Sequence, residues 1–222
     1  MALLRFLVFA LIVAGAFGFI IYQIAKFSFF INSPKSIAKK DSKKLRQTIQ
    51  HLVSDLVPLT DQEVELFSLN RHEKRERKPT YTLISGVYKS IYHEPLMAFA
   101  LKRYRARDMV TLLAKTFNHE FFYLDTDGDV KVYHNGEELG VINNEGQLIN
   151  PQRNELLASI DDLDVLRLNP ITIEKREVGK LLNPVYADTV NPRAFHLIEE
   201  MNDREKVLFM AITFYHIAFE IH

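Results

Sequence analysis

Basic side chains concentrated around one tyrosine are the strongest candidates for ligand chemistry in this 222-residue sequence. They are Lys102, Arg103, Arg105 and Arg107, and they flank Tyr104. A guanidinium group donates two parallel hydrogen bonds to phosphate oxygens, and an ammonium group adds a mobile point charge. The cluster therefore predicts a site for a phosphate-bearing group such as an anionic lipid headgroup. The alternative is a solvated hairpin loop whose charges bind nothing.

Two acidic turns invite a metal interpretation that their spacing does not favour. Asp125, Asp127 and Asp129 surround Gly128, whereas an EF-hand loop needs glycine at its sixth position and glutamate at its twelfth. A tight hairpin turn is the better interpretation. A second acidic turn follows at residues 161–164. We predict no metal at either turn and no cofactor.

Catalytic motifs of the common kinds do not occur in the sequence. It has no Gly-x-Ser-x-Gly elbow, no His-Glu-x-x-His pair and no phosphate-binding glycine loop, and it has no cysteine. His216 lies within an apolar stretch, where a hydrogen-bonded core histidine is commoner than a ligand. We therefore predict a protein that is not an enzyme, with an enzyme as the less favoured alternative.

Overall charge excludes one class of partner. The chain has 28 basic and 28 acidic side chains, so no global field attracts nucleic acid. Charges of both signs run almost unbroken through residues 70–79, which predicts a solvated linker. Just before it, Thr60 and Glu63 have the spacing of a capping box, which predicts a short helix.

The first apolar stretch is long enough to cross a membrane. From Phe6 to Ala25, Gln23 is the only strongly polar residue, and about 20 apolar residues span a bilayer as a helix. A cleaved signal peptide is the alternative, but the apolar run continues beyond its candidate cleavage site at residues 14–16. We predict an uncleaved anchor over residues 1–27. The side chains expected to anchor it include Phe6, Phe9, Ile12, Phe19 and Ile20.

Several basic residues follow this apolar stretch. They run from Lys26 to Arg46, against Arg5 alone on the other side, which predicts a single-pass protein with a cytoplasmic C-terminal domain. The opposite orientation is the alternative. Helical spacing within residues 41–57 predicts an amphipathic helix that packs on the domain, pairs with a second copy, or lies on anionic headgroups. Juxtamembrane helices and the charged linker together make up residues 28–79.

From Thr80 onward, short apolar runs alternate with turn residues. Dipeptides such as Asn135-Gly136 are hairpin signals, because both residues tolerate positive φ. Many short strands without a long helix between them predict an antiparallel barrel or sandwich over residues 80–222. The predicted strands are residues 81–88, 96–102, 109–116, 120–124, 130–134, 138–142, 147–149, 156–160, 165–168, 172–175, 178–182 and 194–198.

The stretch from Asp203 to Ile221 is almost wholly apolar after its first charges, so no face of a helix there could be left to water. Its uncharged part rises only about 20 Å as a helix, less than a membrane span needs. We predict a mainly β fold, a closed antiparallel barrel of about 12 strands around this helix, with a second span as the alternative. The predicted core residues of the helix are Leu208, Phe209, Ile212, Phe214, Tyr215 and Phe219.

A residue-specific resemblance appears in the last forty or so positions. The positions that carry it are Val178, Gly179, Lys180, Ala187, Asp188, Phe195, Phe219 and Glu220, and residues 138–142 (ELGVI) carry a weaker one. This segment resembles the end of the phospholipid scramblase, LURP-one-related and Tubby C-terminal group. The resemblance implies a twelve-stranded barrel around a C-terminal helix, with phosphoinositide binding through a basic surface patch. The chain lacks the cysteine-rich segment of scramblases, and its predicted anchor lies at the opposite end.

The function expected from these features is a membrane-anchored, non-enzymatic Tubby- or scramblase-like module that docks on a lipid surface or on protein. The expected partners are membrane lipid, in particular anionic headgroups, integral membrane proteins, and a second copy of the chain through residues 41–57. A structural or accessory subunit of a membrane complex is the alternative. A lipid scramblase or an enzyme is less favoured.

Overall fold

The computed structural model describes residues 15, 18–19, 22–23, 34–126, 128–161, 167–183 and 191–219. The chain divides into two compact units, residues 1–41 and 42–222. Helix α2 (Pro34–Val53) crosses this boundary, and only its part from Ser42 onward belongs to the second unit.

The predicted membrane anchor lies almost wholly outside the described residues. This applies to Phe6, Phe9, Ile12 and Ile20, whereas Phe19 is helical and exposed. Within the part of the chain that the structure describes, no helix has the length and apolar character needed to cross a bilayer.

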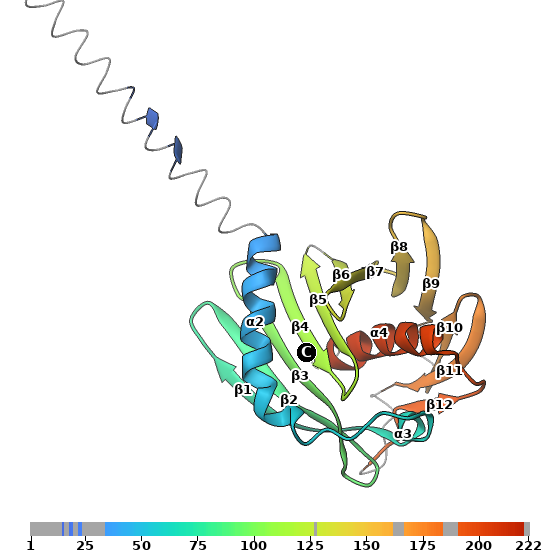
Figure 1. Ribbon diagram of the computed structural model, residues 1–222. Coiled ribbons are helices and arrows are strands. Elements are labelled where there is room, and N and C mark those ends of the chain that lie inside the picture. Colours follow the sequence, from blue (N-terminus) through green and yellow to red (C-terminus); the bar gives the residue numbers. More distant parts are fainter. Residues whose placement is uncertain are drawn as a thin grey trace, which may run out of the picture. The chain divides into compact units, whose positions relative to one another are not determined.

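Among the described residues, one antiparallel sheet of twelve strands dominates the second unit, and each strand pairs with its neighbours in sequence (Figure 1). Every connection is therefore a hairpin-type return. The strands are β1 (Phe67–Arg77), β2 (Tyr81–Ser90), β3 (Pro95–Tyr104), β4 (Met109–Lys115), β5 (Glu120–Thr126), β6 (Asp129–His134), β7 (Glu137–Ile142), β8 (Gln147–Asn150), β9 (Glu155–Ile160), β10 (Leu168–Ile173), β11 (Arg176–Leu182) and β12 (Phe195–Leu197).

The first and last strands bring the sheet close to a closed barrel. The amide of Ala194 donates to the carbonyl of Phe67 at 2.7 Å, and Ser68 forms an isolated antiparallel bridge with Arg193. No continuous ladder joins β1 and β12 among the described residues. The barrel is therefore nearly closed, which leaves little unpaired edge.

Helix α4 (Asp203–Phe219) lies among the strands and supplies the centre of the core (Figure 1). Two buried tyrosines bind its backbone: the hydroxyl of Tyr88 donates to the carbonyl of Ile217 at 2.9 Å, and that of Tyr123 to Ala211 at 2.8 Å. The sequence prediction of a buried helix is confirmed. Leu208, Phe209, Ile212 and Phe214 are buried, and Tyr215 and Phe219 are partly buried and pack on the core.

The outer face of β3, β4 and β5 is also buried. Phe121 points inward, since its ring meets Phe214 of α4 edge-on at 5.8 Å. Its neighbour Phe122 therefore points outward, yet it is buried. Leu45 and Ile49 of α2 are fully buried as well, and the part of this helix from Ser42 onward lies along this side of the sheet (Figure 1). The second unit thus has a core on each side of these strands.

Strand β1 corrects the prediction of a solvated linker over residues 70–79. The short helix predicted before it is α3 (Asp61–Glu65), and the amide of Thr60 donates to the carboxylate of Glu63 at 3.1 Å as expected. Charged residues in β1 are exposed or partly exposed, and ion pairs such as Arg71 with Glu73 link positions two apart on one face. A strand with a solvated face accommodates them.

Strand β10 corrects a second prediction, the break between the predicted strands at residues 165–168 and 172–175. The structure has one strand, in which Pro170 lies opposite Lys180. The carbonyl of Pro170 accepts from the amide of Asp161 at 3.1 Å. Proline is tolerated because the ladder there uses its carbonyl and needs no N–H.

Because α4 is buried, truncation of its side chains should lower the free energy of unfolding. Phe214→Ala should lower the free energy of unfolding by about 3 to 5 kcal/mol, since it empties the centre of the barrel. Phe117→Ala is the matched control, because Phe117 is 57% exposed and its loss should cost less than about 0.5 kcal/mol. Urea unfolding followed by circular dichroism in mild detergent measures both. An equal loss of unfolding free energy in the two variants would contradict the burial of α4 among the strands.

Candidate functional site

Tyr81 and Tyr104 stand opposite each other where β2 begins and β3 ends, and two lysines pack on them. The ammonium group of Lys102 lies 4.7 Å from the centre of the Tyr81 ring and 4.2 Å from that of Tyr104. Lys44 of α2 donates to the Tyr81 hydroxyl at 2.6 Å and lies 4.6 Å from the same ring centre. We name these four residues the basic–aromatic cluster. Such cation–π contacts are strongest where water is excluded.

The four predicted phosphate-binding residues occupy three different environments. Lys102 is only 6% exposed and belongs to the basic–aromatic cluster. Arg103 points to the other face of β3, where its guanidinium carbon lies 5.9 Å from the Phe219 ring centre at the end of α4. Arg105 and Arg107 are exposed in the turn between β3 and β4. Of the four residues, these last two are the most exposed to solvent.

A second contact fixes α2 on its other side. Arg46 donates twice to one carboxylate oxygen of Glu120, at 2.8 and 2.6 Å, and the ammonium group of Lys115 lies 3.5 Å from the other oxygen. Burial raises the pKa of Glu120, but the hydrogen bond and charge of Arg46, with Lys115, outweigh burial and hold this pKa below its ordinary value. Lys44 and Arg46 thus attach one helix to β2 and to β5.

The acidic hairpin turn that the sequence predicts is confirmed. Asp125 accepts a hydrogen bond from the amide of Gly128 at 3.3 Å, and Gly128 has a φ of +94°. Asp127, Asp162 and Asp164 lie outside the described residues. Among the residues described, no three histidine, aspartate or glutamate side chains are placed to hold a metal ion.

His119 and His134 form a pair that the sequence did not indicate. Nδ1 of His119 lies 3.0 Å from Nε2 of His134, and the ring of Phe121 stacks on His134. Burial lowers the pKa of both imidazoles, and the charge of His119 lowers that of His134 further. One ring nitrogen of the pair donates to the other, and this contact holds the β4–β5 turn against the end of β6.

Comparisons with known proteins add no functional assignment. No family model, no curated protein and no solved structure matches this chain. The geometry of its own residues carries the functional argument.

Lys44 and Tyr81 are the residues of the cluster that sequence reasoning missed. They lie 37 positions apart, so only the fold brings them together. One signal was present: Lys102 and Tyr104 are two residues apart, and in a strand such residues share a face.

The lowered pKa of Glu120 predicts a pH-dependent contribution to stability. A carboxylate whose pKa is depressed by folding stabilises the fold above its unfolded pKa, and this contribution is lost as the pH falls through the folded pKa. Glu120→Gln should therefore cost up to about 1 kcal/mol near neutral pH, a surface-type value because Arg46 is half exposed. The difference from the wild type should shrink between about pH 5 and pH 3.

Urea midpoints measured across this pH range provide the test. Glu155→Gln is the control, because Glu155 is exposed at the start of β9 and its replacement should leave a small difference at every pH. A Glu120→Gln difference that stays constant down to pH 3 would contradict the ion pair with Arg46.

Proposed function

We propose that the chain is a membrane-anchored, non-enzymatic module whose barrel docks on anionic lipid headgroups through Arg105, Arg107 and Lys43. The observation that carries this proposal is the basic–aromatic cluster. Because Lys44 is bound to Tyr81, α2 is held at the ends of β2 and β3 that border the β3–β4 turn. In this proposal the exposed Lys43 of α2 adds its charge to that of the turn.

The exposed charges suit phosphate chemistry. Arg105 and Arg107 carry the fork of donors that matches a phosphate group, and Asp108 is the one acidic residue of their turn. Lysine and arginine near an anionic leaflet each contribute about 1 kcal/mol. Three such residues give weak, salt-sensitive binding that needs a second membrane attachment.

The apolar stretch from Phe6 to Ala25 is the proposed second attachment. A tether at the membrane raises the effective concentration of the barrel at the headgroups. The basic residues after this stretch favour a cytoplasmic barrel, and the cytoplasmic leaflet is the anionic one. The resemblance to the scramblase and Tubby group supports the same arrangement, because phosphoinositide binding is the expectation that it carries.

Protein docking is the second candidate function, and two exposed aromatic side chains favour it. Tyr92 is 67% exposed in the β2–β3 turn, and Phe117 is 57% exposed in the β4–β5 turn. Since β3 follows one turn and β4 precedes the other, both rings lie at the end of the sheet opposite Arg105 and Arg107. A subunit of a membrane complex could use them, because aromatic side chains are enriched in protein interfaces.

The absence of native cysteine allows a direct test of headgroup docking with the full chain in vesicles. We introduce Ala106→Cys, label it with a fluorophore, and place a quencher on the lipid headgroups. Quenching should be stronger in anionic than in neutral vesicles and should fall at high salt. Arg105→Glu with Arg107→Glu should abolish the difference between the two lipids.

The matched control for charge is Arg153→Glu with Lys175→Glu, two exposed residues in the β8–β9 and β10–β11 turns, which should leave quenching unchanged. A label at Gln152→Cys controls for position and should show little quenching. Equal quenching in neutral and anionic vesicles would overturn lipid docking through this turn.

A further inference from the structure

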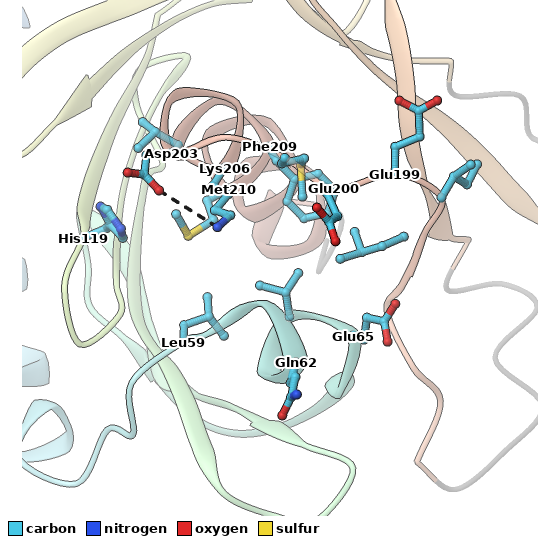
Figure 2. Close-up of a pocket in the computed structure, with 15 residues that line it drawn as sticks. Leu59, Gln62, Glu65, His119, Glu199, Glu200, Asp203, Lys206, Phe209 and Met210 are labelled. Atoms are coloured by element: carbon cyan, nitrogen blue, oxygen red, sulfur yellow. Dashed lines mark ion pairs between the residues drawn. The ribbon is translucent and has the colours of Figure 1, made fainter.

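A cavity of about 570 Å³ opens where α4 enters the barrel. Four segments line it: the α3 region from Leu59 to Glu65, the β4–β5 turn at His119, residues 197–201 after β12, and the first turns of α4. Figure 2 shows α3 facing these turns of α4 across the cavity. The volume lies in the range of small-molecule sites.

The floor of the cavity is apolar. Val64, Phe209 and Met210 are buried, and Leu59 and Val207 pack against the same core. Methionine adapts its shape to what it contacts. A hydrocarbon chain that displaced water from this apolar surface would gain free energy from its own burial.

The rim carries a surplus of negative charge. Its carboxylates are Glu65, Glu199, Glu200 and Asp203, and Lys206 is the one lysine or arginine among the described lining residues. Glu199 is bound to Arg176, and Asp203 lies 4.0 Å from Lys206. Neither Glu65 nor Glu200 forms an ion pair within the described ranges.

An anionic ligand is disfavoured although the N-terminus of a helix lies at the cavity. The amide of Glu205 donates to the side-chain oxygen of Asn202 at 3.0 Å, and the carboxylate of Glu205 accepts from the amide of Asn202 at 2.8 Å. This capping box already satisfies two of the N–H groups at the helix N-terminus, and the negative charge of Asp203 already opposes the helix dipole.

From the apolar floor and the acidic rim, we infer that this cavity binds a small amphiphile whose hydrocarbon chain ends in an ammonium group. The chain lies on Val64, Phe209 and Met210, and the ammonium group meets Glu65 and Glu200. The inference is independent of headgroup docking, because the β3–β4 turn lies at the other end of β4 from His119.

Photolabelling of the full chain in lipid nanodiscs tests the site. The probe is a long-chain alkylamine that carries a diazirine, and mass spectrometry maps the labelled peptides. Label should concentrate in residues 59–65 and 197–201. Dodecylamine should compete for these peptides, whereas dodecanoate, with the opposite charge, and butylamine, without the chain, should not.

Two double variants test which carboxylates bind the ammonium group. Glu65→Gln with Glu200→Gln should reduce labelling of these peptides about fivefold, as expected for the loss of partly exposed ion pairs. Glu155→Gln with Glu177→Gln, at exposed positions on β9 and β11, is the matched control and should leave labelling unchanged.

Three results would overturn the inference. They are competition by dodecanoate as strong as by dodecylamine, labelling spread evenly over the chain, and labelling unaffected by Glu65→Gln with Glu200→Gln. Competition by a lysine- and leucine-containing peptide, without competition by dodecylamine, would also overturn it and place a protein segment in the cavity.

Discussion

A helix without a polar face can exist only where every side of it is kept from water, and the second unit of this chain is built to meet that requirement for α4. Phe209 and Phe214 alone bring large apolar surfaces to the centre, each worth about 1.5 to 3 kcal/mol when fully buried. The strands supply rings around them, and the hydroxyls of Tyr88 and Tyr123 bind the carbonyl groups of the helix. These two hydroxyls are therefore buried without a loss of hydrogen bonds.

The outer face of the same strands must also be kept from water. Strand β3 is buried along most of its length, and a strand covered on both sides becomes a nearly continuous apolar run. Helix α2 covers this outer face with Leu45 and Ile49, and Lys44 and Arg46 hold it at β2 and β5. This part of the helix is thereby a structural layer of the barrel, which explains why the compact unit begins at Ser42. Leu45 and Ile49 are buried in this layer and are not exposed for pairing with a second copy.

The architecture was largely predictable because its signals are local. Asn135-Gly136 forms the turn that it predicts, since both residues adopt positive φ, and the apolar character of α4 required a sheath. Strand β1 could not be identified in the same way. Most of its side chains are charged, and its pairing with β2 is what holds it as a strand. The candidate site was half predictable. The charges of Arg105 and Arg107 are visible in the sequence, but the burial of Lys102 beneath Tyr81 depends on a pairing between strands.

The chain has zero net charge, but the two ends of β4 lie in regions of opposite charge. The turn before this strand exposes Arg105 and Arg107, whereas the turn after it brings His119 to a cavity whose rim is acidic. An anionic surface would attract the first end and repel the second, so in the proposed docking the charges would orient the barrel as well as attract it. A barrel held in this way would keep its cavity away from the headgroups and open to solvent. Docking and ligand binding could then operate together, because each uses the end of the strands that the other leaves free.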